Sequence, residues 1–139
     1  MSTAEKSPLP TVREQRPTIL LVEDEPPILI ALSDFLKENG FATLEAADAV
    51  KAIQIIKSNP IGIDLVFSDV KMPGDMDGFG LAMWVRTNRP KLPIILCSGD
   101  AKKLDAVEQL GPEVPFLAKP YDLKLLVAQI RQSLQPSSN

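Results

Sequence analysis

The chain has 139 residues, of which 45% are hydrophobic and 24% are charged, and its formal net charge is −3. This length allows one domain with a proper hydrophobic core and is too short for two ordinary domains. The small negative charge argues against a protein that wraps nucleic acid by bulk electrostatics, and no apolar run approaches the ~20 residues of a membrane span. The sequence has no histidine, which excludes histidine metal ligands, histidine general bases and phosphohistidine donors from this chain.

Strand-like apolar runs alternate with helical patterns along most of the sequence. A polar, proline-containing segment over 1–17 precedes them and a short polar stretch over 136–139 follows, so we expect a flexible tail and a disordered C-terminus around a folded domain over 18–135. In chain order, the pattern predicts strands over 18–23, 41–46, 63–69, 93–98 and 114–118, and helices over 26–39, 48–58, 77–88, 101–109 and 122–134.

This strict alternation predicts the fold class. Strands that alternate with helices form a parallel sheet covered by helices on both faces and joined by right-handed crossovers. We therefore expect a doubly wound α/β domain with five parallel strands and five helices. Ligands bind to such sheets beyond the carboxyl ends of the strands. Asp24, Asp69, Ser98 and Lys119 all stand at predicted carboxyl ends, so we expect the chemistry at one edge of the sheet.

Three acids, Glu23, Asp24 and Asp69, close two of the apolar strands and will meet if these strands are neighbours. Two unit charges about 4 Å apart interact with roughly 4 kcal/mol at an effective dielectric of about 20, so three carboxylates together require a nearby cation. Oxygen ligands without histidine or cysteine suit Mg²⁺. Mg²⁺ and the ammonium group of Lys119 would balance the three negative charges.

Asp69 is the best-placed nucleophile of the cluster. A carboxylate can attack phosphorus to form an acyl phosphate, and Asp69 ends the third predicted strand just before a turn that contains Pro73. Phosphoryl transfer asks the protein mainly for positioning and charge neutralisation. Mg²⁺ and Lys119 would neutralise charge, and Ser98 is able to donate a hydrogen bond to a phosphoryl oxygen.

Five short segments, in this order and spacing, resemble the receiver domain of bacterial two-component response regulators. The resemblance extends over about 17–135 and implies a flavodoxin-like sheet with the strand order 2-1-3-4-5. It implies a phosphorylation-dependent signalling switch in which Asp69 accepts a phosphoryl group from the phosphohistidine of a partner. The segments are Leu20–Glu25, Asp64–Pro73, Met76–Gly78, Cys97–Gly99 and Ala118–Pro120.

The resemblance also implies roles for individual residues. Ser98 and Lys119 would grip the phosphoryl group, and the rotamer of Phe116 would report on the phosphorylated state. The bond between Lys119 and Pro120 is often cis in this family, which an X-Pro bond permits at low cost. The Mg²⁺ ligands that the resemblance implies are Glu23, Asp24, Asp69 and the backbone carbonyl of Lys71.

The partners that the resemblance implies are proteins. A histidine kinase or a histidine phosphotransfer protein would donate the phosphoryl group, and a downstream protein that the sequence does not name would bind the phosphorylated surface. We expect a stand-alone cytoplasmic protein, a monomer or weak homodimer, with no nucleic-acid or membrane partner. The single cysteine, Cys97, allows no intrachain disulfide and fits a reducing compartment.

The chain departs from the commonest family pattern after Pro73. The turn reads Gly74-Asp75-Met76-Asp77, one residue longer than usual, and in this respect it resembles the receivers of hybrid kinases. In the family, the positions of Lys71 and Asp100 flank the entrance to the phosphorylation site. We expect this pair to control the access of water.

The first predicted helix carries two apolar residues that we expect to face away from the core. Leu29 and Ile30 lie off its inward stripe and are predicted to dock the helix of a kinase or phosphotransfer protein. The predicted inward stripe consists of Ile28, Ala31, Leu32 and Phe35.

Two other classes of function remain open from the sequence. A phosphorylation-independent adaptor would keep the fold without the switch. A phosphatase of the haloacid dehalogenase type would need an Asp-x-Asp pair after its first strand, where this chain has Glu23-Asp24-Glu25-Pro26. In the leading interpretation the protein is not an enzyme with a separate substrate, because it catalyses only its own aspartyl phosphorylation and dephosphorylation.

Overall fold

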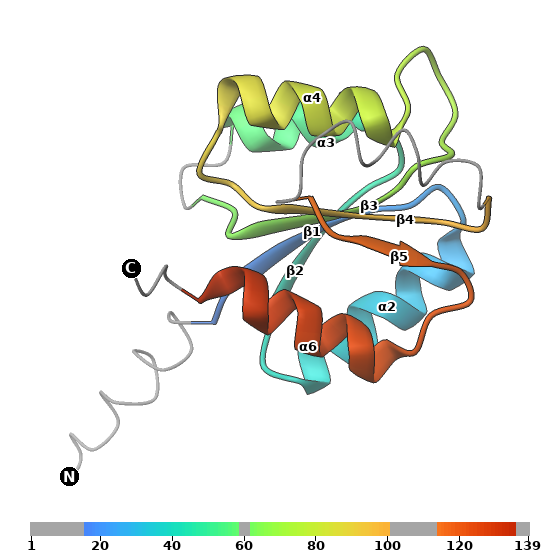
Figure 1. The fold of residues 1–139 in the computed structure, drawn as a ribbon, viewed down its shortest axis with the longest axis vertical. Coiled ribbons are helices and arrows are strands. Elements are labelled where there is room, and N and C mark those ends of the chain that lie inside the picture. The colour runs from blue at the N-terminus through green and yellow to red at the C-terminus, as the bar shows by residue number, and fades with distance from the viewer. Residues whose placement is uncertain (1–15, 59–61, 101–113, 136–139) are drawn as a thin grey trace, which may run out of the picture.

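The computed structural model describes residues 16–58, 62–100 and 114–135. Five parallel strands form one sheet in the order β2-β1-β3-β4-β5 (Figure 1), so the predicted order is confirmed. The strands are β1 (Thr18–Val22), β2 (Ala42–Ala46), β3 (Leu65–Asp69), β4 (Ile94–Ser98) and β5 (Phe116–Ala118), and the helices of the described ranges are α2 (Pro26–Glu38), α3 (Ala49–Ser58), α4 (Gly78–Asn88) and α6 (Leu123–Leu134).

The helices cover both faces of the sheet, as a doubly wound fold requires. Helices α3 and α4 lie on one face, and α2 and α6 lie on the other (Figure 1). The expected helix over 101–109 and the expected chain ends over 1–15 and 136–139 lie outside the described residues. Within the described ranges, no helix combines the length and the apolar character needed to cross a bilayer.

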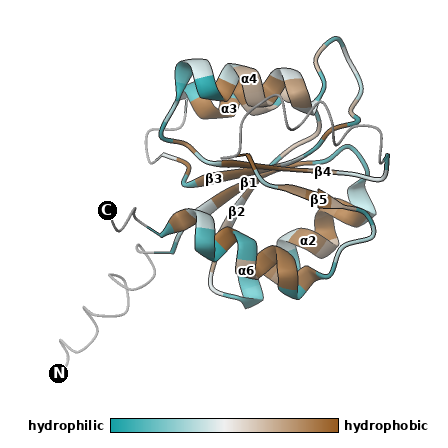
Figure 2. Cartoon of the chain, viewed as in Figure 1, coloured by the Kyte–Doolittle hydropathy of each residue, from teal (hydrophilic) through white to brown (hydrophobic). Residues whose placement is uncertain are grey.

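Alternation along the strands divides the core into two layers. In β1, Leu20 and Val22 pack under α3 and α4, whereas Ile19 and Leu21 pack against α2 and α6. Successive side chains of a strand point to opposite faces, and both faces are covered here, so β1, β3 and β4 are apolar along their whole length. Figure 2 shows these strands in the hydrophobic part of the colour scale, while the helices carry both colours.

Proline explains why two strands begin later than their sequence patterns predicted. Strand β4 begins at Ile94 instead of residue 93, and β5 begins at Phe116 instead of residue 114. Pro93 and Pro115 accept hydrogen bonds through their carbonyls, from Val66 (3.0 Å) and Leu96 (3.0 Å) respectively. Proline has no N–H to donate, so each of them serves as the last residue before a strand.

The buried face of α2 differs from the predicted stripe. Ala31 is exposed, and Leu29 is partly buried against the α2/α6 layer of the core. The reason is Ser33, a buried serine whose Oγ lies 2.7 Å from the Thr43 Oγ1 of β2. This polar contact turns the helix so that Leu29, Ser33 and Leu36 share the inner side, at the spacing of helical neighbours.

Replacing Leu20 with alanine is expected to lower the free energy of unfolding by about 2–5 kcal/mol, because the change removes buried methyl groups and leaves a cavity. Leu20 is fully buried on β1, between β2 and β3. The control is Val50→Ala on α3, where the side chain is 53% exposed and the loss should stay within about 0.5 kcal/mol. Denaturant unfolding followed by circular dichroism measures both values, and equal losses would contradict the assigned core.

Candidate functional site

The carboxyl ends of β1 and β3 bring the predicted acids to one edge of the sheet. Val22 pairs with Ser68 in the parallel register, so the next residues along the two strands are Glu23 and Asp69. Glu23 also donates its backbone N–H to the Ala46 carbonyl at the end of β2 (3.0 Å). The sheet order therefore decides that these two acids meet, as the sequence predicted.

Asp69 is 7% exposed, and both of its carboxylate oxygens have partners. The Lys119 ammonium donates to Oδ2 at 2.7 Å, and the Lys71 backbone N–H donates to Oδ1 at 3.3 Å. A buried carboxylate is costly unless it is paired and hydrogen-bonded. The site thus keeps an ionised acid at the end of the central strand, with one edge toward solvent.

Lys119 reaches Asp69 from the end of β5. Its backbone N–H donates to the Ser98 carbonyl at 2.9 Å, and its peptide bond to Pro120 is cis, as the resemblance implied. Burial works to lower the pKa of Lys119, but the hydrogen bond and the charge of Asp69 outweigh it and the pKa lies above its usual value. The lysine therefore stays protonated at neutral pH.

Ser98 ends β4 and is buried beside this ion pair. Its Oγ accepts a hydrogen bond from the Asp100 backbone N–H at 3.0 Å. A serine hydroxyl that accepts in this way still has its own hydrogen to donate. The side chain is therefore able to donate to an acceptor in the site.

A second group of carboxylates lies at the end of β1. Oxygens of Glu23, Asp24 and Glu25 lie within 4.8 Å of one another, and Glu23 is 4% exposed while the other two are exposed. Burial raises the pKa of Glu23, the hydrogen bond from the Glu25 N–H (3.0 Å) opposes the rise, and the charge of Asp69 adds to it. An all-oxygen donor set held under mutual repulsion fits a hard divalent cation such as Mg²⁺.

The composition of this group differs from the predicted ligand set. Glu25 belongs to it although the sequence argument did not select Glu25, and Asp69 lies outside the 4.8 Å grouping. Lys119 holds the Asp69 carboxylate at 2.7 Å, so its charge is already balanced without the β1 acids. The signal for Glu25 was present in the sequence, because the run Glu23-Asp24-Glu25 places three acids in succession.

The longer turn after Pro73 is accommodated without disturbing the start of α4. Gly74 takes a φ of 96°, a left-handed conformation that favours glycine. Asp77 then caps α4, because its Oδ1 accepts a hydrogen bond from the Gly80 N–H at 3.0 Å. The cap and the first turn of α4 lie next to β3, since the Gly78 N–H donates to the Val70 carbonyl at 2.8 Å.

The remaining predicted residues lie around the site. Lys71 and Asp100 are exposed, as side chains that flank an entrance must be. Phe116 begins β5, pairs with Leu96 and is half-buried against the α3/α4 layer of the core. The roles assigned to these three residues remain predictions.

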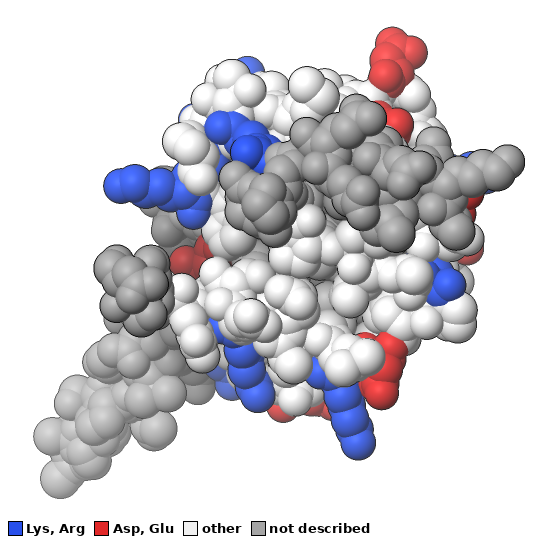
Figure 3. Space-filling model, viewed as in Figure 1, with Lys and Arg blue, Asp and Glu red and all other residues white. Residues whose placement is uncertain are grey.

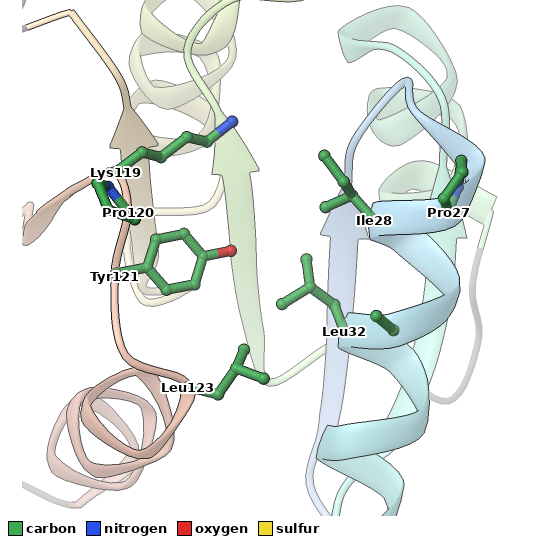
Figure 4. A pocket seen from close by; sticks show the side chains of 8 residues that line it. Pro27, Ile28, Leu32, Lys119, Pro120, Tyr121 and Leu123 are labelled. Carbon is green, nitrogen blue, oxygen red and sulfur yellow. The ribbon is translucent and has the colours of Figure 1, made fainter.

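An apolar groove of about 640 Å³ adjoins the ion pair. Ile28 and Leu32 of α2 point toward Tyr121 across it, and Lys119 stands at its upper end (Figure 4). Tyr121 is a site residue that the sequence argument missed, and it also packs edge-on against Phe67, with ring centroids 5.7 Å apart. Its lining residues are Pro27, Ile28, Ala31, Leu32, Lys119, Pro120, Tyr121 and Leu123.

The two residues predicted to dock a partner differ in exposure. Ile30 is 58% exposed, whereas Leu29 is partly buried against the core. Both lie on α2, the helix that forms one wall of the groove. Ile30 is therefore the stronger candidate for contact with another molecule.

The family model for the response regulator receiver domain matches residues 19–131. The chain belongs to this family. The response regulator GtcR of Aneurinibacillus migulanus is 35% identical over 119 residues, which cover 85% of this chain and 48% of that protein. Sporulation initiation phosphotransferase F of Bacillus subtilis is 30% identical over 124 residues, which cover 87% of this chain and 96% of that protein.

The fold comparison agrees with the sequence comparison. The response regulator TrrA of Thermotoga maritima, solved in complex with Mg²⁺-BeF, superposes with a TM-score of 0.75 at 26% identity, covering 85% of this chain and 99% of that one. Receiver domains are phosphoryl-accepting signalling switches, and this receiver domain is one of them. The chain spans about half the length of GtcR, which is 48% covered.

In metal-free buffer at pH 7, Glu23→Gln is expected to raise the free energy of unfolding of this receiver domain. The raised pKa of Glu23 means that its protonated form stabilises the fold fully below the ordinary pKa of 4.5, and that this contribution is lost as the pH rises through the folded-state pKa. Glutamine loses nothing over that range, and the gain scales as about 1.4 kcal/mol per pKa unit.

The control for this change is Glu25→Gln, since Glu25 is exposed in the same carboxylate group. Urea unfolding at pH 4 and at pH 7 provides the comparison. A Glu23→Gln gain that is equally large at both pH values would show that charge repulsion is not its cause.

Proposed function

We propose that this receiver domain accepts a phosphoryl group onto Asp69 from the phosphohistidine of a partner protein. The observation that supports this most directly is the environment of Asp69. Its carboxylate is 7% exposed at the end of the central strand and is paired with the Lys119 ammonium at 2.7 Å. A nucleophile that is fixed in position and neutralised by a nearby cation is what phosphoryl transfer requires.

The transfer exchanges one bond to phosphorus for another. A carboxylate oxygen of Asp69 forms the new O–P bond while the N–P bond of the phosphohistidine breaks, and the imidazole leaves with the electron pair of that bond. The donor must belong to another molecule, because this sequence contains no histidine. The domain acts as no separate enzyme and catalyses only its own phosphorylation and dephosphorylation.

Lys119 and Ser98 hold the phosphoryl group in this proposal. The Lys119 ammonium already lies at Asp69 Oδ2 and keeps its proton, and the Ser98 hydroxyl has a hydrogen to donate. Lys119 directly follows β5, which begins at the half-buried Phe116. Movement of Lys119 toward a phosphoryl oxygen would therefore be felt along β5, and a change in the Phe116 rotamer is the proposed readout.

Mg²⁺ is the metal that the donor set fits. When bound, it would neutralise negative charge on the phosphoryl oxygens. The TrrA structure, described as an Mg²⁺-BeF complex, supports this assignment by similarity. Glu25 is a further carboxylate of the same group. The residues that would hold the ion are Glu23, Asp24, Asp69 and the backbone carbonyl of Lys71.

The donor in this proposal is a histidine kinase or a histidine phosphotransfer protein. Its phosphohistidine would approach Asp69 between Lys71 and Asp100, which are both exposed, while its helix contacts Ile30 and the groove beside Tyr121. An apolar helix face buries well in an apolar groove. The groove adjoins Lys119, so a bound helix would lie next to the nucleophile.

The rest of the proposed biology follows the expectations from the sequence. The domain works in the cytoplasm as a monomer or weak homodimer and signals to a downstream protein, without nucleic-acid or membrane partners. On the described part of the face shown in Figure 3, Lys and Arg side chains lie in separate groups around a largely uncharged centre. This distribution differs from the continuous basic surface that tracks a phosphate backbone.

Asp69→Asn is expected to abolish phosphorylation by acetyl phosphate in the presence of Mg²⁺ while leaving the fold intact, because the amide has no carboxylate oxygen to attack phosphorus. Intact-protein mass spectrometry detects the added phosphoryl group. The matched control is Asp34→Asn, which changes an exposed acid of α2 in the same way. Labelling of Asp69→Asn at the rate of Asp34→Asn would refute Asp69 as the acceptor.

Ile30→Ser is expected to slow phosphoryl transfer from a phosphorylated histidine phosphotransfer protein about 10-fold, the equivalent of ~1.4 kcal/mol of docking energy. The rate with acetyl phosphate should not change, because that donor needs no docking surface. Met83→Ser is the control, since Met83 is 60% exposed on α4 and Ile30 is 58% exposed on α2. Equal protein-to-protein rates for the two variants would place the docking surface elsewhere.

A further inference from the structure

Two buried contacts converge on the main-chain carbonyl of Asp69. Ser68, which is fully buried, donates its hydroxyl to the Asp69 carbonyl oxygen at 2.8 Å. On α4, Gly78 faces the same oxygen so closely that a Cβ atom added to Gly78 would lie 2.5 Å from it. Neither residue touches the carboxylate, yet both act on the backbone that carries it.

The backbone after Asp69 is also held from two sides. The Val70 N–H donates to the Cys97 carbonyl of β4 at 2.9 Å, and the Val70 carbonyl accepts from the Gly78 N–H at 2.8 Å. A Cβ at Gly78 would lie 2.7 Å from the Val70 Cα. These atoms belong to the backbone of a central strand, so they cannot move aside as a flexible side chain would.

We propose that Ser68 and Gly78 are positioning residues for phosphoryl acceptance, an inference that rests on Asp69 being the acceptor. Together they fix the height and rotation of the Asp69 backbone, and hence the direction of its side chain. The carboxylate must meet the Lys119 Nζ at 2.7 Å and the Lys71 N–H at 3.3 Å at the same time. A shift of the backbone by a fraction of an ångström changes both distances together.

The structure also explains why Gly78 differs from its neighbour Gly80 on the same helix. A Cβ at Gly80 would meet the Met76 Cγ at 2.7 Å, which is part of a flexible side chain, and would not approach the Asp69 backbone. Alanine at either position brings the same gain in helix propensity. Gly78→Ala and Gly80→Ala therefore differ mainly in whether the acceptor strand must move.

Ser33 offers the matching comparison for Ser68. Both serines are buried and both make hydroxyl hydrogen bonds, since Ser33 Oγ lies 2.7 Å from the Thr43 Oγ1. Ser33 lies on α2 and its contact leads to β2, away from Asp69. Loss of a buried serine hydrogen bond in general is thus separable from loss of this one.

The test is the rate of Asp69 labelling by acetyl phosphate at saturating Mg²⁺, measured for folded Ser68→Ala and Gly78→Ala beside Ser33→Ala and Gly80→Ala. We expect the first two to be labelled at least about 10-fold more slowly than the wild type, as misplacement of a reacting group predicts. The two controls should keep the wild-type rate. Thermal unfolding of all four shows how much stability each change costs, and a purely structural role would alter that value without altering the rate.

The inference is overturned if folded Ser68→Ala and Gly78→Ala are labelled as fast as their controls. If Gly78→Ala does not fold, Ser68→Ala decides alone, because it adds no atoms. Failure of the proposed function looks different, since the wild type and both controls would then also remain unlabelled. That result would end the acceptor assignment and the positioning role together.

Discussion

One ion pair organises the carboxyl edge of this sheet. The Lys119 ammonium at the end of β5 meets the buried Asp69 carboxylate at the end of β3, at 2.7 Å and across the intervening strand β4. Without a cation, a carboxylate at this depth would lose its hydration with nothing in return. The pairing keeps Asp69 ionised, and the same charge raises the pKa of the lysine.

The ion pair in turn depends on the packing of the two core layers. Strands β1, β3 and β4 are buried on both faces, so their register is specified by every side chain along them. That register places Glu23 beside Asp69 and brings the Ser98 carbonyl to the Lys119 N–H. A site built on such rigid strands holds its charged groups in place before any ligand arrives, which is an advantage for electrostatic catalysis.

Much of this arrangement could be predicted from residue patterns, and the errors have physical causes. Prolines shortened two strands, because Pro93 and Pro115 have no N–H to join the ladder. The inward face of α2 was wrong at Ala31, because apolar periodicity could not anticipate that Ser33 would be buried by its hydrogen bond to Thr43. Glu25 and Tyr121 were missed, since one counted as part of a charged loop and the other as an ordinary aromatic residue.

The sequence by itself determined the fold class, the family and the identity of the chemical groups, because apolar runs and acids at strand ends are local signals. The tertiary structure decided which groups meet. Asp69 and Lys119 are separated by 50 residues, yet they lie in contact because parallel strands end at the same edge. It also decided that Gly78 must lack a side chain, since only the packing of α4 on β3 brings it to the Asp69 carbonyl.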